Sequence, residues 1–172
     1  MQETIRYAWG TSSLGEFLCA ASAYGLVSLE FGKPESSLAS LLQRRFPSAA
    51  LIEDPATLQE AVEQAASLIE HPAQNARLPV DPRGSDFERQ VWCALQEIPA
   101  GGTTSYGELA SRLGVPGLAK DVGEACASNS IAVVIPCHRV LRKDGSLAGY
   151  RWGTWRKRTL LERECLENFT LR

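Results

Sequence analysis

The chain has 172 residues, of which 44% are hydrophobic, and its 18 Lys and Arg against 20 Asp and Glu give a formal net charge of −2. This apolar content excludes a disordered chain. The sequence contains no run of about 18 apolar residues, so no membrane span is predicted. The N-terminus has no secretory signal pattern and the five cysteines form no C-x-x-C pair, so we expect a cytoplasmic protein with free thiols and no metal site.

The N-terminal half predicts a small sheet followed by two helices. Short segments rich in aromatic and branched residues, separated by glycine turns, favour an antiparallel meander. The predicted strands are residues 4–9, 16–21 and 26–31, and the predicted helices are residues 38–46 and 54–70. The second helix is indicated by Asp54 and Pro55, a good N-cap followed by a good first helical residue.

Three prolines between residues 71 and 84 indicate a linker. We therefore expect two domains, residues 1–80 and 84–172.

The C-terminal half predicts mostly helix. Ser85 with Glu88, and Ser105 with Glu108, have the spacing of capping boxes. The predicted helices are residues 85–98, 105–113, 116–128 and 154–169. The second and third are joined by a tight glycine-containing turn, which is a helix-turn-helix pattern. A continuous apolar run predicts a buried strand over residues 131–135.

Charge is unevenly distributed along the chain. Residues 1–83 carry 6 basic and 10 acidic groups, whereas residues 84–172 carry 12 basic and 10 acidic groups. Seven basic residues and one acid lie between Arg139 and Arg158. Such a cluster attracts phosphates, although a solvated surface explains it equally well.

A cysteine and a histidine follow the predicted buried strand. Pro136 cannot donate to a β-ladder, so the strand ends there and the Cys137 side chain can face a pocket. A thiol needs a neighbouring base or cation to become a thiolate at neutral pH. His138 is adjacent, but neighbouring residues on an extended chain point to opposite faces, so we expect a water molecule to relay the proton. The alternative for His138 is an ordinary core histidine.

Glu164 is the candidate partner of His138. It lies one helical turn after Leu160, inside the apolar arc of the last predicted helix, where a carboxylate needs a partner. Cys137, His138 and Glu164 would then act as nucleophile, base and orienting acid. A surface carboxylate paired with Arg163 or Lys157 is the alternative.

The segment Pro136-Cys137-His138-Arg139-Val140 resembles the active-site motif of the O6-alkylguanine-DNA alkyltransferases. The resemblance covers nearly the whole chain and is greatest to the alkyltransferase half of Ada-type methylation-response proteins. Further matches occur at Arg83-Gly84, Phe87, Gln90-Val91-Trp92, Ile98-Pro99, Thr104-Ser105-Tyr106, Asn129 and Gly149-Tyr150-Arg151-Trp152-Gly153.

This resemblance implies an α/β (α+β) fold, with a ribonuclease-H-like N-terminal domain that contains an antiparallel sheet and a winged-helix-like C-terminal domain that contains the helix-turn-helix. It implies direct repair of double-stranded DNA, in which the alkyl group of a flipped O6-alkylguanine moves irreversibly to Cys137. No cofactor and no metal are implied. A monomer associated with a bacterial nucleoid is expected.

The resemblance also implies roles for individual residues. Cys137 would attack, His138 would take its proton through water, and Glu164 would orient His138. Tyr106 would protonate N3 of the leaving guanine, and Asn129 would brace the turn beside the nucleophile. The implied pocket residues are Val140, Tyr150 and Arg151. The implied DNA contacts are Lys120, Ala127, Ser128, Arg139, Thr104 and Ser105, with Arg139 also expected to hold the motif in place.

One helix departs from the family pattern. Lys120 stands where the family usually has an arginine that fills the gap left by the flipped base, and lysine lacks the planar guanidinium. Asp121 and Glu124 are acidic where the family is usually neutral or basic, and acids repel phosphates. We therefore expect weaker DNA binding or slower repair than in an arginine-bearing relative.

Three other interpretations stay open at this point. A non-catalytic lesion-binding protein would share the fold, although proteins of that kind lack the motif cysteine. A cysteine hydrolase would use the same three side chains with turnover. The chain could also be one part of a longer regulator. The sequence leaves open the tolerated alkyl size and the preference between O6-alkylguanine and O4-alkylthymine.

Overall fold

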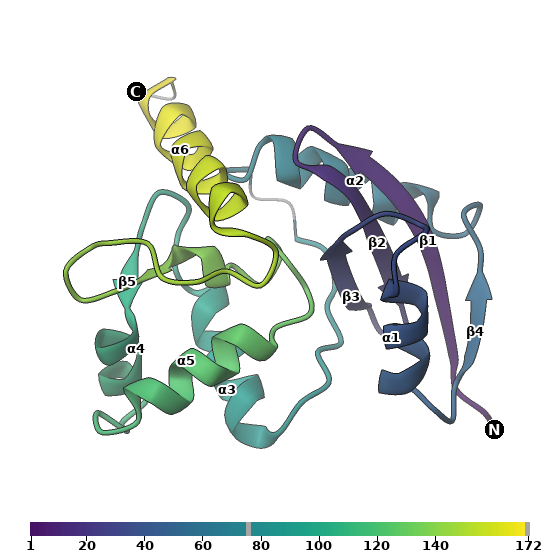
Figure 1. Ribbon diagram of the computed structural model, residues 1–172, viewed down its shortest axis with the longest axis horizontal. Coiled ribbons are helices and arrows are strands. Elements are labelled where there is room, and N and C mark those ends of the chain that lie inside the picture. Colours follow the sequence, from purple (N-terminus) through teal and green to yellow (C-terminus); the bar gives the residue numbers. More distant parts are fainter. Residues whose placement is uncertain (75–76, 171–172) are drawn as a thin grey trace. The chain divides into compact units, whose positions relative to one another are not determined.

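The computed structural model describes residues 1–74 and 77–170, which fold into two compact units (Figure 1). The N-terminal unit contains residues 1–70, 77–82 and 130–132, and the C-terminal unit contains the other described residues. The predicted mixed α/β class is confirmed, whereas the ribonuclease-H-like and winged-helix-like descriptions stay predictions. Within the described ranges, no helix combines the length and the apolar character that crossing a membrane requires.

A four-stranded sheet of order β3-β2-β1-β4 forms the N-terminal unit. The predicted meander is present as β1 (Thr4–Ser12), β2 (Gly15–Ala21) and β3 (Leu26–Phe31), all antiparallel. The fourth strand, β4 (Ala50–Glu53), pairs parallel with β1 and was not predicted. It has only four residues and none is fully buried, so it lacks the apolar pattern that marks a strand in the sequence.

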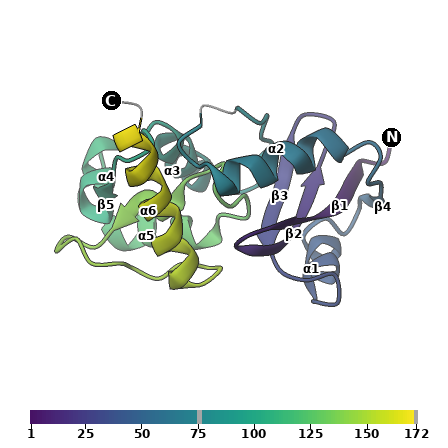
Figure 2. The ribbon, with the colours of Figure 1, turned by 90° about the horizontal axis from the view of Figure 1, so that it is seen from above.

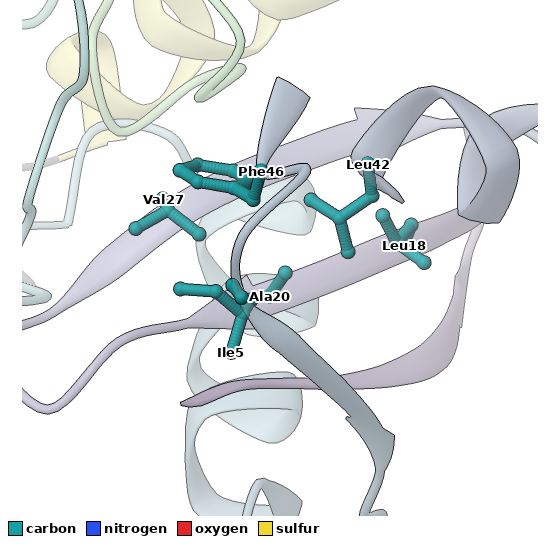
Figure 3. Close-up of a cluster of buried hydrophobic side chains, with 7 residues drawn as sticks. Ile5, Leu18, Ala20, Val27, Leu42 and Phe46 are labelled. Carbon is teal, nitrogen blue, oxygen red and sulfur yellow. The ribbon is translucent and has the colours of Figure 1, made fainter. Parts of the chain in front are cut away.

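Two helices cover opposite faces of this sheet (Figure 2). The first, α1 (Leu38–Arg45), lies over the face where a hydrophobic cluster gathers. Figure 3 shows most of that cluster, whose buried members are Ile5, Leu18, Ala20, Val27, Leu42, Phe46 and Ala49. The second helix, α2 (Gln59–Glu70), brings Val62 together with Phe17 beside Gly10, where an added Cβ would lie under 3.0 Å from both side chains.

The predicted start of the second helix is wrong by five residues. Asp54 does cap a turn, because its Oδ1 accepts a hydrogen bond from the Thr57 amide at 3.0 Å. Residues 55–58 form turns, however, and regular helix begins only at Gln59.

The C-terminal unit is built from α3 (Asp86–Gln96), α4 (Tyr106–Arg112), α5 (Ala119–Ser128) and α6 (Thr154–Thr170). Both predicted capping boxes are present, at the starts of α3 and α4. Helix α5 packs against both α3 and α4, and the Trp92 indole donates a hydrogen bond to the Ala125 carbonyl at 2.8 Å. The third predicted helix starts late, because Pro116 and the residues up to Leu118 lie in the turn that precedes α5.

The predicted strand over residues 131–135 is wrong, although its burial is right. Only Ile131 forms a bridge, to Leu29, and the chain then turns through Val133, whose φ is +67°. Ladder pairing cannot continue through that left-handed turn. The motif cysteine therefore lies in a short 3₁₀ helix, η1 (Cys137–Arg139), rather than at the end of a strand.

A two-stranded parallel ladder connects the motif to the start of α4. Strand β6 (Val140–Leu141), directly after η1, pairs with β5 (Thr104–Ser105), which directly precedes Tyr106. Residues distant in sequence are thus held side by side by backbone hydrogen bonds.

Candidate active site

A cavity of about 340 Å³ lies within the C-terminal unit and contains the motif cysteine. Its lining residues are Tyr106, Gly123, Cys126, Ala127, Cys137, Gly149, Tyr150 and Arg151. The volume lies within the usual range for small-molecule sites. Helix α5 and the loop before α6 supply its walls, so the cavity opens beside the second helix of the helix-turn-helix pattern.

The nucleophile candidate, Cys137, is fixed from two sides. Its amide donates to the Ile135 carbonyl at 2.8 Å within the turn. The Asn129 side-chain amide donates both to the Ile135 carbonyl at 2.9 Å and to Cys137 Sγ at 3.3 Å. These bonds fit the expected bracing role of Asn129, and its direct contact with the sulfur was not indicated by the sequence.

His138 and Glu164 form a fully buried pair, with His138 Nε2 and Glu164 Oε1 2.7 Å apart. An ionised carboxylate only accepts, so Nε2 carries the proton and Nδ1 keeps a lone pair that can take another. Burial lowers the pKa of His138, with the Glu164 carboxylate acting in the opposite direction, and the imidazole is therefore neutral and able to act as a base.

Burial alone would raise the pKa of Glu164, but the hydrogen bonds and charges of His138 and Arg139 outweigh it and lower that pKa. The carboxylate therefore stays ionised at neutral pH. This arrangement supports the predicted base and orienting acid over the alternative of a surface carboxylate.

Arg139 is an internal cation, not a surface one. Its guanidinium donates to both Glu164 oxygens, at 2.9 to 3.2 Å, and to the Ile98 carbonyl. Only 9% of the residue is exposed. The prediction that Arg139 holds the motif in place fits this geometry. Its guanidinium bonds groups inside the unit, and the predicted contact with DNA stays a prediction.

Lys157 is the second buried cation of the predicted basic cluster. It is 1% exposed, and its ammonium donates to the Val140 carbonyl at 2.6 Å. The sequence placed Lys157 in a basic cluster that fitted a phosphate-attracting or a solvated surface equally well, but the residue is buried and its charge acts on the thiols of the site. Val140, predicted as a pocket residue, is fully buried and is not one of the described residues that line the cavity.

The thiol of Cys137 is protonated at rest. Burial raises its pKa most strongly, while the Asn129 hydrogen bond and the charges of Lys157 and Arg151 act in the opposite direction. A buried thiol of this kind needs a base before it can attack, and the neutral His138 is adjacent. Cys126, which also lines the cavity, has a pKa raised to about 12, mainly by burial, and keeps the role of a buried hydrophobe.

Tyr106 begins α4 and lines the same cavity. Burial, followed by the nearby Cys126 and Cys137 thiols, raises its pKa to about 12. The phenol therefore keeps its proton at neutral pH and is available as a hydrogen-bond donor or an acid inside the cavity. The β5–β6 ladder accounts for its position next to the motif.

The other predicted contact residues differ in exposure. Lys120 has a 90% exposed side chain that lies 3.9 Å from Glu124, and Ala127 is exposed as well. Ser128 donates to Glu88 at 2.8 Å and is half-buried. Thr104 and Ser105 are also half-buried, with the Ser105 hydroxyl accepting from the Glu108 amide as part of its cap.

Tyr150 and Arg151, predicted as pocket residues, both line the cavity. The sequence missed Gly123 and Gly149 in the lining and missed the buried position of Lys157. Helical spacing from Ala127 contained a signal for Gly123, since residues four apart share a helix face.

Residues 86–166 match the family model described as the DNA-binding domain of 6-O-methylguanine DNA methyltransferase. The bifunctional transcriptional activator/DNA repair enzyme Ada of Escherichia coli is 42% identical over 160 residues, which are 93% of this chain and 45% of that protein. The chain spans about half the length of this relative and of the regulatory protein Ada of Salmonella typhimurium.

Other relatives match over most of their length. The inducible methylated-DNA–protein-cysteine methyltransferase of Bacillus subtilis is 37% identical over 149 residues, which are 86% of this chain and 83% of that protein. The crystal structure of Mycobacterium tuberculosis OGT in complex with DNA superposes with a TM-score of 0.77 at 36% identity, over 92% of each chain.

Proposed function

The chain belongs to the methylated-DNA–protein-cysteine methyltransferase family, and on that premise we propose that it repairs DNA by moving the alkyl group of O6-alkylguanine onto its own Cys137. One observation carries the proposal: Cys137 lines a cavity, and the next residue, His138, is paired with the buried Glu164 carboxylate at 2.7 Å. The proposed acceptor is the protein itself, so each molecule reacts once and no cofactor takes part.

The substrate base must leave the DNA stack to react. Cys137 is 6% exposed and lies below the molecular surface, so an alkyl group inside a duplex could not reach its sulfur. A flipped guanine would enter the cavity past α5, whose exposed Lys120 and Ala127 are the proposed duplex contacts. Bound DNA is thus the partner, and the proposed place of action is the cytoplasm at the bacterial nucleoid.

Proton removal precedes transfer. His138 Nδ1 takes the Cys137 proton through a water molecule, while Glu164 accepts the Nε2–H bond and stabilises the imidazolium that forms. The thiolate then attacks the alkyl carbon in line with the C–O6 bond. A sulfur–carbon bond forms as the carbon–oxygen bond breaks, and the released electron pair goes to the guanine.

The leaving guanine needs a proton at the same time. Tyr106 is the acid we assign, because it lines the cavity and its phenol keeps its proton at neutral pH. It protonates N3 of the guanine and regains a proton from solvent. Asn129 keeps the sulfur in place through its 3.3 Å hydrogen bond as the charge on the sulfur changes.

Intact-mass spectrometry tests the proposal. After incubation with a duplex that carries one O6-methylguanine, we expect the protein to gain the mass of one methyl group less one hydrogen, located on Cys137 by peptide mapping. At most one methyl group is expected per molecule. The matched control is Cys165→Ser, which removes an exposed thiol of α6 and should keep the full gain.

A chain that binds the modified duplex without any mass gain would be a lesion-binding protein, and the proposed transfer would then be wrong. Repeated release of product by one molecule would equally contradict the single-turnover reaction.

A further inference from the structure

Two buried polar atoms of the site have no hydrogen-bond partner. In the described part of the chain, His138 Nδ1 and the Tyr150 hydroxyl are the buried side-chain nitrogen and oxygen atoms left without one. Buried polar groups are nearly always paired, and an unpaired one costs free energy, so each such atom in a native protein needs an explanation. Both unpaired atoms belong to residues that surround Cys137.

The Tyr150 ring is held in a fixed orientation. It meets the Trp152 ring edge to face, with centroids 5.2 Å apart and planes inclined by 72°. The Arg156 guanidinium donates to the Trp152 carbonyl at 2.6 Å, which fixes the backbone of this loop against α6. The residue lines the cavity together with Cys137, and its hydroxyl is buried.

The surroundings of the Tyr150 hydroxyl fix its protonation state. Burial raises the pKa of Tyr150 well above its usual value, and the charges of Cys137 and Glu164 raise it further, with Arg156 acting in the opposite direction. The phenol therefore keeps its proton at neutral pH and can donate a hydrogen bond there.

We propose that Tyr150 is a positioning residue, whose hydroxyl and His138 Nδ1 together hold the water molecule that takes the proton from the Cys137 thiol. This inference rests on the function proposed above and assigns a residue to its proton path. A buried water needs two to four polar partners, and the thiol, the imidazole nitrogen and the phenol supply three.

The hydrogen-bond directions are consistent before and after transfer. Before it, the water accepts from the thiol S–H and from the Tyr150 O–H, and it donates to Nδ1. As the proton moves, the water passes one hydrogen to Nδ1 and takes the thiol hydrogen. Afterwards it donates to the thiolate and accepts from the imidazolium N–H. The Tyr150 hydroxyl donates in both states, so it anchors the water without titrating.

The test measures thiol reactivity without DNA. Wild type and Tyr150→Phe are treated with iodoacetamide across a range of pH, and alkylation of Cys137 is followed by peptide mass spectrometry, because Cys93 and Cys165 are also exposed to the reagent. Loss of one hydrogen bond predicts about three- to tenfold slower alkylation at neutral pH and a rate midpoint moved to higher pH. At high pH, where the thiolate forms without help, the two rates should converge.

Two further variants serve as controls. Tyr24→Phe changes an 80% exposed tyrosine of the N-terminal unit and should reproduce the wild-type profile. Tyr106→Phe removes the other hydroxyl of the cavity, so it should slow methyl transfer from DNA but move the alkylation midpoint less than Tyr150→Phe does. Unchanged thermal melting of Tyr150→Phe would show that the fold is intact.

Equal slowing at every pH would mean that Tyr150 only shapes the cavity, and this result would overturn the inference. So would an unchanged profile, or a midpoint shift that Tyr106→Phe matches. If the wild-type protein took no methyl group from DNA but Tyr150→Phe still moved the midpoint, the proposed function would fail and the role of Tyr150 would stand.

Discussion

Replacing Glu164 by glutamine removes one charge from the centre of the C-terminal unit and changes almost no volume. In the wild type the carboxylate accepts hydrogen bonds from His138 at 2.7 Å, from Arg139 at 2.9 to 3.2 Å and from the Gly101 amide at 3.2 Å. In Glu164→Gln the amide NH₂ would face donors, and the buried Arg139 guanidinium would have no anion.

The size of the effect follows from that arrangement. Removing one partner of a buried ion pair costs about 3–5 kcal/mol, because the other charge is left uncompensated. For a chain of this size each kcal/mol lowers Tm by about 2–4 °C, so we expect a fall of about 6–20 °C in the transition of the C-terminal unit. Glu162→Gln is the matched control, since Glu162 is exposed on the same helix and should change stability by about 0.5 kcal/mol at most.

The pH dependence has a definite sign. The folded state lowers the pKa of Glu164, so its contribution is complete above the unfolded value of about 4.3 and is lost as pH falls through the folded value. The difference between wild type and Glu164→Gln should therefore shrink in acid. The folded state also lowers the pKa of His138, so the unfolded chain binds a proton first, and the wild type should lose stability below about pH 6.5.

Urea unfolding followed by tryptophan fluorescence measures these differences, because Trp92, Trp152 and Trp155 all report on the C-terminal unit. A loss below about 1 kcal/mol, or a loss that Glu162→Gln reproduces, would refute the view that the Glu164 carboxylate compensates the buried Arg139 charge. If the stability difference between wild type and Glu164→Gln stayed constant down to pH 3, the assignment of a negative charge to Glu164 would be refuted.

Two more predictions concern cations. Lys157→Met removes the buried charge that lowers the pKa of Cys137, so haloacetamide alkylation of this thiol at pH 7 should slow several-fold and recover at high pH; an unchanged rate would mean that the Lys157 charge does not reach the sulfur. Lys120→Arg adds a planar group that can stack on bases. At low salt it should tighten binding to a duplex that contains O6-methylguanine about two- to fivefold, measured by filter binding or by an anisotropy titration. Unchanged affinity would contradict this prediction.

Local signals predicted the regular elements well. The capping boxes at Ser85 and Ser105 each depend on residues three positions apart, and both helices begin where these predict. The apolar run at residues 131–135 misled, because burial and strand geometry are separate properties. Most of those residues are buried, while the left-handed Val133 and the missing N–H of Pro136 exclude a ladder.

At the site, too, local features were predictable from the sequence and long-range contacts were not. The Cys137-His138 neighbourhood is local, and Glu164 was predictable because helical periodicity placed a carboxylate in an apolar arc. The inward positions of Arg139 and Lys157 were not predictable from a count of basic residues. Each depends on a carbonyl far away in sequence, 41 residues for Ile98 and 17 for Val140, and only the folded chain brings these acceptors within reach.

These buried cations explain how one short segment can serve both stability and chemistry. Arg139 holds Glu164 ionised, Glu164 holds His138 in the tautomer that leaves Nδ1 basic, and Lys157 bonds the backbone of Val140. Val140 in turn pairs with Thr104 in the ladder that precedes Tyr106. The proposed acid and the proposed nucleophile are therefore tied to one backbone ladder.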